Sequence, residues 1–407
     1  MTRLGDVADM LVGFAFKSAG FLDADADGVR LLRGDNVQQG YIRWGDKTKK
    51  WPSSECDELG RYQLAENDVI LAMDRPIVGD GLKMAWIKPE DLPALLVQRV
   101  CRLRGKPGSA LTSFIRYVLA APEFSAHIHR ITTGANIPHI SGKDIAAYEF
   151  NLPDLADQSC IVECLSAYDD LIATNQRRIA LLEDAARRLY REWFVHLRFP
   201  GHESVLVKDG VPEGWAKLSL GDVAEITMGQ SPESRYYNTD GDGLPFHQGV
   251  SDFGHRFITH ETFTRQATRV AAAGDILCSV RAPVGRLNLT RDNIAIGRGL
   301  SAMRSRAGHQ SLLFYQLRGL FVEEDMIGGG AIFASVGKKE LFGQLILQPE
   351  AEIAAVFDRI ASDIDRQIDT LDAQNRSLAD ARDLLLPKLM SGQLDVSGVR
   401  LPEEVAA

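Results

Sequence analysis

The chain has 407 residues, of which 45% are hydrophobic and 25% are charged, the composition of an ordinary globular protein with two or three domains. Its 46 Lys and Arg residues against 55 Asp and Glu residues give a formal net charge of -9, and this acidic total, taken alone, argues against binding to a polyanion. No apolar run approaches the ~20 residues of a membrane helix, and the charged N-terminus lacks the pattern of a signal peptide.

The cysteines indicate a reducing compartment. There are 5 of them and no Cys-x-x-Cys pair: Cys56, Cys101, Cys160, Cys164 and Cys278. An odd number without paired spacing is typical of reduced thiols. We therefore expect a cytoplasmic protein with no membrane partner, no disulfide framework and no metal site.

Residues 1–154 predict a first globular domain of mixed α/β type. The short apolar run Val69–Met73, preceded by Asp68, has the pattern of a buried strand, and Ser113–Ala121 is expected to be a helix. Basic residues cluster between positions 75 and 106 and around Trp44 and Trp51. Such clusters with interleaved aromatic residues suit phosphate and base contacts, although ordinary solvated surface charge is the alternative interpretation.

Residues 155–200 predict one long helix. Its apolar positions alternate steps of three and four, which is the spacing of a coiled-coil seam. The seam is Leu165, Tyr168, Ile172, Asn175, Ile179, Leu182, Ala186, Leu189 and Trp193. From Leu165 to Leu189 the seam covers about 36 Å at ~1.5 Å per residue, and the whole rod approaches about 60 Å. One turn of B-DNA is ~34 Å, the spacing at which paired modules meet half-sites on one face.

Residues 201–348 repeat the first domain. Leu4–Ala8 returns as Leu220–Ala224, and Arg75–Gly79 matches Arg281–Gly285. The distance between matching positions varies along the domain, which indicates loop insertions on a shared scaffold. We expect a second α/β domain, in which the run Ile276–Val280 forms a buried strand. A helix is also expected in this domain, at Ser311–Phe321.

Residues 349–396 predict a second long helix, followed by a tail at 397–407. The same alternating seam returns as Ala361, Ile364, Ile368, Leu371, Asn375, Leu378, Arg382, Leu385 and Leu389. From the match of Pro153 with Pro349 onward the offset stays at 196 residues, which indicates rigid elements that accept no insertions. The expected fold is therefore two α/β (α+β) domains in a tandem pseudo-twofold repeat, separated by an antiparallel two-helix coiled coil.

An antiparallel register accounts for both seams. If Asn175 faces Asn375, every seam residue of one helix meets a seam residue of the other, and we expect a buried contact of these two Asn side chains to fix the register. Arg382 opposite Tyr168 is the weak point and must be solvated or stacked. The alternative is two amphipathic helices packed separately, each on its own domain.

The acidic charge is unevenly distributed. Residues 1–150 have 19 basic and 19 acidic side chains, and residues 201–345 have 15 and 16. Most of the excess negative charge lies in the helical segments and the tail, whereas 256–306 holds nine Arg against three acidic residues. The total charge therefore does not exclude polyanion binding by the two domains.

Several motifs resemble one known family, the specificity (S) subunits of type I restriction-modification systems. The motifs are Gly274–Gly285, Ile296–Leu300, Gly229–Pro232 with Tyr236–Asn238, Thr133–Ile140, and Leu384–Met390 with Ser391–Gly392. The resemblance covers nearly the whole chain, in the order recognition domain, helix, recognition domain, helix. The first domain departs from the second where Met73-Asp74-Arg75-Pro76 replaces Ser279-Val280-Arg281-Ala282-Pro283.

The resemblance implies a non-catalytic, sequence-specific reader of double-stranded DNA. Each recognition domain would read one half of a bipartite target, and the helices would act as a ruler and as a docking surface for two methyltransferase (M) subunits and for restriction (R) subunits. The chain itself would hold no cofactor; S-adenosylmethionine belongs to the M subunits, and ATP and Mg belong to the R subunits. The competing hypothesis is a two-module protein-binding scaffold on a coiled-coil rod.

Candidate DNA contacts are chosen by side-chain chemistry, because Arg and Lys suit guanine and Asn and Gln suit adenine in the major groove. In the first domain they are Lys17, Arg33, Asn36, Lys47, Lys49, Lys50, Arg75 and His139. In the second they are Gln230, Ser231, Arg235, His247, Gln248, Arg281, Arg286 and Arg298. No methyltransferase tetrad, phosphate loop or HExxH motif is found, so no catalytic residue and no metal ligand is predicted.

Overall fold

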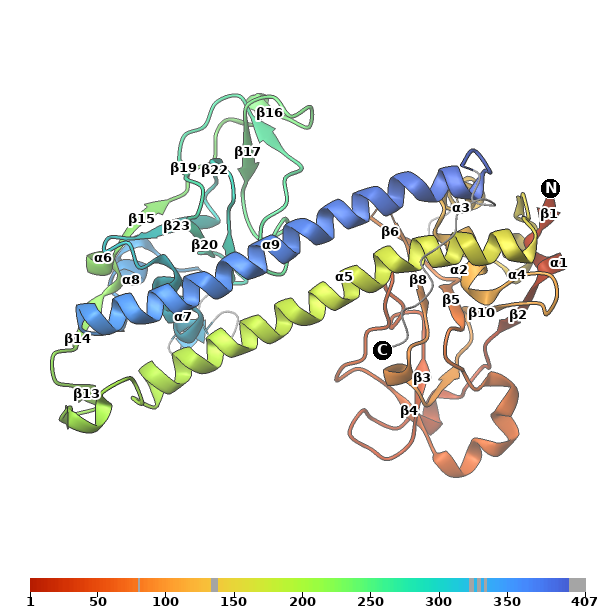
Figure 1. Cartoon of the computed structure of the whole chain (residues 1–407), viewed down its shortest axis with the longest axis horizontal. Helices are drawn as coiled ribbons and strands as arrows, with labels where there is room; N and C mark the ends of the chain where they lie inside the picture. The colour runs from red at the N-terminus through yellow and green to blue at the C-terminus, as the bar shows by residue number, and fades with distance from the viewer. Residues whose placement is uncertain (80, 133–137, 322–325, 328–330, 333–334, 395–407) are drawn as a thin grey trace. The chain divides into compact units, whose positions relative to one another are not determined.

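A computed structural model describes residues 1–79, 81–132, 138–321, 326–327, 331–332 and 335–394 (Figure 1). The chain divides into two compact units. Unit 1 is Met1–Thr174 with Gln374–Ala407, and unit 2 is Asn175–Ala373. The tail at 397–407 and most of the motif Thr133–Ile140 lie outside the described residues.

A four-stranded antiparallel sheet forms the centre of unit 1. Its order is β2 (Ala8–Val12), β10 (Val100–Gly105), β5 (Val69–Ala72) and β8 (Met84–Trp86). All four side chains of β5 are buried, because both faces of the sheet are covered. Alternate residues of a strand point to opposite faces. Val69 and Leu71 accordingly pack in one apolar cluster, with the helix α2 (Thr112–Ala120), whereas Ile70 and Ala72 pack in another.

The second cluster is completed by a smaller sheet, of order β4 (Lys50–Trp51), β3 (Val29–Leu32) and β9 (Ala94–Leu96), in which β3 and β9 run parallel. The other short elements of unit 1 are β1 (Thr2–Arg3), α1 (Leu4–Val7), β6 (Ile77–Val78), β7 (Gly81–Leu82), α3 (Pro122–Thr132), α4 (Gly142–Ala146) and β11 (Glu149–Phe150). The strand predicted at Val69–Met73 and the helix predicted at Ser113–Ala121 are thus confirmed to within a residue at each end.

Unit 2 has a central sheet of the same strand order. It consists of β15 (Ala224–Met228), β23 (Leu300–Ser305), β20 (Ile276–Ser279) and β21 (Leu287–Leu289), all antiparallel. The helix α7 (Gln310–Leu320) packs in the same apolar cluster as β20. The strand and helix predicted for this domain are confirmed, again with small shifts at the ends.

A five-stranded sheet joins the central one in unit 2, of order β16 (Tyr237–Asn238), β18 (Phe263–Thr264), β17 (Leu244–His247), β22 (Ile294–Ile296) and β19 (Val270–Ala271). Its pair β17 and β22 is parallel, as β3 and β9 are in unit 1. The remaining elements are β12 (Val207–Lys208), β13 (Val211–Pro212), β14 (Ala216–Ser219), α6 (Leu220–Val223), β24 (Met326–Ile327), β25 (Ala331–Ile332), α8 (Lys338–Phe342) and β26 (Leu345–Gln348).

Two long helices, α5 (Leu155–Tyr190) and α9 (Ala351–Met390), contribute to both units. In unit 1, Arg382 of α9 forms a 2.7 Å ion pair with Asp169 of α5. In unit 2 the ring of Phe357 in α9 lies 5.7 Å from the ring of Trp193, in the short π-helical turn that follows α5. Each pairing agrees with the antiparallel register to within one residue.

The ion pair with Asp169 also explains why Arg382 is tolerated in an apolar seam. The predicted contact of Asn175 with Asn375 joins one unit to the other and stays a prediction. None of the helices in the described part of the chain is both long and apolar enough to cross a membrane.

One hydrogen bond recurs in the two units and fastens the sheet domain to a long helix. Tyr117 of α2 donates to Asp169 of α5 at 2.8 Å, and Tyr315 of α7 donates to Asp365 of α9 at 2.9 Å. Each carboxylate also binds a guanidinium from its own unit, Arg116 in unit 1 and Arg256 in unit 2. Burial raises the pKa of both tyrosines, so they remain hydrogen-bond donors.

Candidate nucleic-acid interface

In unit 2 three chain segments converge on the loop 297–299, which joins β22 to β23. The amide of Gln230 donates to Ile296 O at 2.9 Å, and the amide of Gly299 donates to Gln248 O at 3.1 Å. The amide of Val280 donates to Gly299 O at 2.9 Å. A Cβ on Gly299 would lie 2.3 Å from the oxygen of Gln248, so this close backbone approach requires glycine.

Five of the predicted residues surround this loop, and we call them the unit 2 rim: Gln230, Ser231, Gln248, Arg281 and Arg298. Ser231 Oγ accepts a hydrogen bond from the amide of Arg298 at 3.3 Å. The other rim side chains are exposed and make no hydrogen bond or ion pair with any residue that the structure describes. Gln248 and Arg281 line the same small cavity of about 120 Å³. The rim therefore offers amide and guanidinium groups on a fixed backbone.

Two other predicted arginines have different surroundings. Arg235 pairs with Glu233 at 3.0 Å and lies 4.8 Å from the centre of the Tyr236 ring. Arg286 lines a different cavity, beside the long helix α5. The sequence pattern grouped these arginines with the rim residues because it carries no information on which loops meet.

His247 requires a correction, because its side chain is fully buried and cannot contact DNA. Its Nδ1 bonds Asp252 at 2.7 Å and its Nε2 bonds His260 at 2.9 Å, and His260 in turn reaches Asp292. Burial lowers the pKa of His247, which favours the neutral ring. The residue supports the rim from below instead, since its carbonyl accepts the amide of Gly297 at 2.8 Å.

Unit 1 has the same backbone arrangement around the loop 97–99. The amide of Phe14 donates to Leu96 O at 3.0 Å, as that of Gln230 does to Ile296 O, and the amide of Met73 donates to Arg99 O at 2.9 Å. A Cβ on Gly13 would lie 2.2 Å from the oxygen of Val97, just as one on Gly229 would collide with Gly297 in unit 2. The two loops are therefore counterparts in the repeat.

The side chains on the unit 1 loop differ. Asp74 binds Arg99 and His139, each at 2.6 Å. Burial favours the neutral acid, but the hydrogen bonds from Arg99 and His139 outweigh it and lower the pKa of Asp74. Arg75 is exposed, and its φ of 44° lies in the left-handed region. We call Asp74, Arg75, Arg99 and His139 the unit 1 rim.

The hydrogen-bond pattern fixes which rim residues correspond. Met73 and Val280 make the same bond to the two loops, so the next residue, Asp74, is the counterpart of Arg281. The isolated bridges of Asp74 with His139 and of Arg281 with Ser335 agree. The sequence match had instead aligned the two arginines, Arg75 and Arg281. The charge at this position is thus reversed between the units.

The remaining candidates of unit 1 are more scattered. Arg33 is the counterpart of Gln248, since Leu32 and His247 occupy the same place in the parallel strand pair. Lys17 and Lys47 are exposed. Lys49 pairs with Asp23 at 2.5 Å, and Lys50 donates to Ala26 O at 2.7 Å. The side chains of Lys49 and Lys50 are thus already engaged in contacts within the protein.

Asn36 is the second correction. Its side chain is buried, accepts the amide of Arg33 at 3.0 Å and donates to Arg43 O at 3.0 Å. These bonds satisfy the amide group internally, so Asn36 shapes the turn after β3 and does not face a ligand. The sequence alone does not distinguish an Asn that forms a turn from one that contacts a base.

Sequence reasoning missed Phe14 and Arg99 in unit 1. Phe14 is an exposed aromatic side chain, 39% accessible, and its backbone pairs with the loop. Arg99 occupies the place that Gly299 holds in unit 2 and adopts a φ of 65°. Aligning the two loops through the repeat would have identified both positions.

The described residues include no group of three or more His, Cys, Asp or Glu side chains arranged to hold a metal ion. The thiols of Cys101 and Cys278 are buried, and burial raises their pKa to about 12. These two cysteines are therefore inert packing residues.

Comparisons with known proteins find relatives among type I specificity subunits. Residues 1–184 match the family described as the type I restriction modification DNA specificity domain. The type I restriction enzyme MjaX specificity subunit of Methanocaldococcus jannaschii is 32% identical over 252 residues, 60% of this chain and 59% of the relative. The EcoAI specificity subunit of Escherichia coli is 36% identical over 174 residues, 42% of this chain and 28% of the relative.

A solved structure shows the same fold. The type I restriction-modification S subunit from M. genitalium aligns with 95% of this chain and 95% of its own length, at 14% identity and a TM-score of 0.57. The resemblance to type I specificity subunits that the motifs predicted is confirmed. The match spans 59% and 28% of the length of the two curated relatives named above.

Proposed function

We propose that the chain is the DNA-recognition subunit of a type I restriction-modification complex. The single observation that carries the proposal is the repeated loop on the repeated sheet: one backbone arrangement, in two copies, presents different polar side chains. Two such surfaces with different chemistry suit the reading of two different half-sites. The relation to specificity subunits supplies the class of ligand.

The chemistry of each rim favours a different kind of contact. In unit 2, Arg281 and Arg298 match the acceptors of guanine, and Gln230 and Gln248 match the edge of adenine. In unit 1, the Asp74 carboxylate is engaged by Arg99 and His139, and Arg75 is an exposed donor beside it. The exposed Phe14 ring adds an apolar surface beside the same loop.

The assembly follows from the same proposal. The tandem units form a pseudo-twofold pair on an antiparallel coiled coil of α5 and α9, which sets the distance between the half-sites. Two methyltransferase subunits dock on the helices and supply S-adenosylmethionine, and restriction subunits supply ATP and Mg. The chain itself is non-catalytic and acts in the cytoplasm.

A domain exchange in the full complex tests the proposal. The chain is assembled with its cognate methyltransferase subunits, and the methylated sequence is mapped on plasmid DNA. Replacing residues 1–154 by the equivalent domain of a relative with another target should change one half of a bipartite site and leave the other half unchanged.

Two results would overturn the proposal. Loss of all methylation by a correctly assembled complex would contradict independent half-site reading. Sequence-independent methylation, or no DNA binding by the complex at low salt, would favour the protein-binding scaffold. Salt must be fixed throughout, because phosphate contacts make affinity depend steeply on it.

A further inference from the structure

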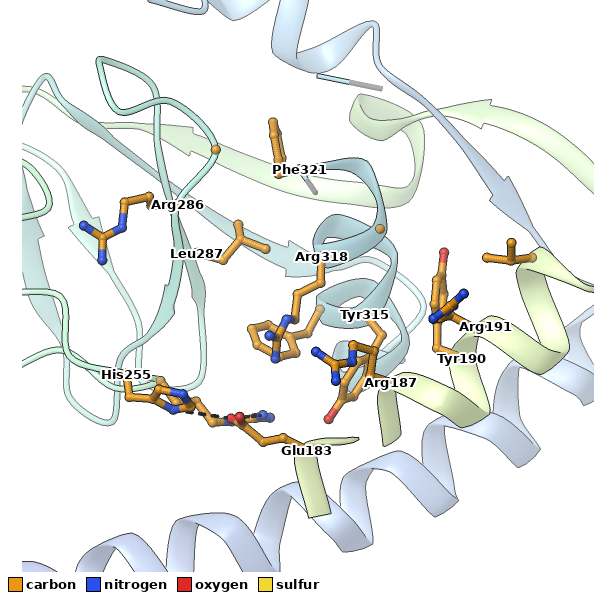
Figure 2. A pocket seen from close by; sticks show the side chains of 15 residues that line it. Glu183, Arg187, Tyr190, Arg191, His255, Arg286, Leu287, Tyr315, Arg318 and Phe321 are labelled. Atoms are coloured by element: carbon orange, nitrogen blue, oxygen red, sulfur yellow. Dashed lines mark hydrogen bonds and ion pairs between the residues drawn. The ribbon is translucent and has the colours of Figure 1, made fainter. Parts of the chain in front are cut away.

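Each unit contains a cavity at the same place, between its sheet-flanking helix and a long helix. The unit 2 cavity, of about 690 Å³, is lined by α7, the end of α5 and residues 285–287 (Figure 2). The unit 1 cavity, of about 720 Å³, is lined by α2, residues 81–86 and parts of α5 and α9. Tyr315 and Tyr117, which make the recurring bond to aspartate, line the two cavities.

The two cavities differ in charge. The unit 1 cavity is balanced, because its Arg116 and Arg382 both pair with Asp169, which also lines it. The unit 2 cavity has a single acidic lining residue, Glu183. Against it stand the arginines Arg187, Arg191, Arg256, Arg286 and Arg318, with His255.

Part of this positive charge is already neutralised. Arg256 is buried and lies 3.3 Å from Glu183 and 2.5 Å from Asp365. Arg187 is paired with Asp184 at 2.5 Å. Arg191 and Arg318, in contrast, make no ion pair with any residue in the described part of the chain. The cavity thus holds two guanidinium groups whose charge is not offset by a carboxylate of any described residue.

The wall behind these groups is aromatic. Phe314, Phe321 and Tyr190 line the cavity, and the Arg318 guanidinium lies 5.8 Å from the centre of the Phe314 ring. Burial raises the pKa of Tyr190 to about 12, so its hydroxyl stays protonated. In Figure 2 the side chains of Arg318 and Arg187 reach into the space between α7 and α5.

We propose that the unit 2 cavity binds a small phosphate-bearing ligand of mononucleotide size. Guanidinium groups bind phosphate through charge-assisted, often bidentate hydrogen bonds, and low local polarity strengthens such bonds. Aromatic walls accept a planar ring, and the volume lies in the ~300–1,000 Å³ range of small-molecule sites. The inference goes beyond DNA reading and does not depend on it.

Calorimetric titration of the full chain at low salt tests the site. CTP and pyrophosphate are the probes, and cytidine is the phosphate-free control. We expect one molecule of CTP or pyrophosphate to bind per chain and cytidine not to bind. Arg191→Ala and Arg318→Ala should each weaken CTP binding by about tenfold or more, the effect of losing one charge-assisted hydrogen bond.

A matched pair of variants separates the cavity from general surface charge. Arg187 and Arg188 both pair with Asp184, at 2.5 and 2.6 Å, but only Arg187 lines the cavity. Arg187→Ala should weaken CTP binding, though less than Arg318→Ala because Asp184 already offsets part of its charge, and Arg188→Ala should change it by less than about twofold. Thermal unfolding checks that every variant is folded, and Arg318→Gln removes the charge but keeps a longer side chain if the alanine variant unfolds.

Several outcomes overturn the inference: no binding of CTP or pyrophosphate, equal binding of cytidine, or equal effects of Arg187→Ala and Arg188→Ala. A short DNA duplex that displaces CTP, and whose own binding is lost with Arg318→Ala, would assign the cavity to DNA phosphate and contradict a free ligand. Failure here leaves the half-site exchange unaffected, so the two proposals fail separately.

Discussion

The two rims share a backbone and differ in almost every side chain. In both units a glycine at the end of the first central strand lets the chain pass against the loop, and several backbone hydrogen bonds to the loop recur. However, Asp74 in unit 1 occupies the position of Arg281 in unit 2, and Arg33 occupies that of Gln248. The comparison teaches that the scaffold and the reading surface are separable, because the loop is held by backbone bonds that do not depend on its side chains.

The largest loss of stability is expected for substitutions that break the recurring tyrosine–aspartate hydrogen bond. Removing one partner of a buried ion pair costs about 3–5 kcal/mol, because the other charge stays buried. Asp169→Ala leaves both Arg116 and Arg382 without their shared carboxylate. In Asp365→Ala, by contrast, Arg256 keeps one carboxylate partner, Glu183 at 3.3 Å. We therefore expect Asp169→Ala to be the more destabilising of the two in urea unfolding.

The control for this pair is Asp369→Ala. Asp369 is 52% exposed and pairs with Arg291 on the surface, so its loss should cost no more than about 1 kcal/mol. Equal free energies of unfolding for the three variants would show that the recurring bond does not fasten the sheet domains to the helices.

The second prediction exchanges the rim charges. Arg281→Asp places in unit 2 the residue that unit 1 carries at the counterpart position. In the complete complex we expect it to weaken binding to the cognate target by about 1–3 kcal/mol, the range for a lost base contact, with the change confined to one half-site. Arg235→Asp, at an arginine that is already paired with Glu233, should have a smaller effect. Equal losses in the two variants would contradict the assignment of the rim.

The third prediction concerns the shared backbone. Gly13→Ala and Gly229→Ala each place a Cβ within 2.2 Å of a carbonyl oxygen of the loop, so each should destabilise its unit by about 1–3 kcal/mol. Gly249, in the unit 2 loops, has open space at the Cβ position, and Gly249→Ala should be nearly neutral. Thermal unfolding measures all three, and a neutral Gly13→Ala would show that the loop can shift.

How much the sequence could predict depended on whether a feature was local. The buried strand at Val69 and the two long helices follow from apolar spacing, which the sequence displays directly. The correspondence of Asp74 with Arg281 depends on hydrogen bonds to a loop some 25 residues away along the chain in unit 1. Alignment by residue identity paired Arg75 with Arg281 instead. The backbone bridges that define the true correspondence join residues far apart in the chain, and the sequence does not reveal them.

Side-chain burial was the second property that limited prediction of the site from the sequence. Asn36 and His247 have the side chains of base readers, but both are enclosed by packing that no local pattern reveals. The repeat held a usable hint for His247, because its counterpart Leu32 is an apolar core residue. A polar residue aligned with a buried leucine is a candidate for an internal bond.

That same substitution gives the last and smallest prediction. Burial lowers the pKa of His247 below its usual 6.5, so the unfolded chain binds a proton more readily than the folded one as the pH falls through this range. Stability contributed by the neutral ring is therefore present at pH 7 and is lost on acidification. The groups that face the ring are Asp252 and His260, with Asp292 behind His260.

His247→Leu copies unit 1 and removes this titration. The variant should lose some stability at pH 7, because Asp252 and His260 lose a partner, but its free energy of unfolding should fall less between pH 7 and pH 5 than that of the wild type. His196→Leu, at an exposed position, should keep the wild-type pH dependence. Parallel curves for wild type and His247→Leu would mean that the buried ring does not govern the acid response of unit 2, and that His247 and Leu32 differ in hydrogen bonding alone.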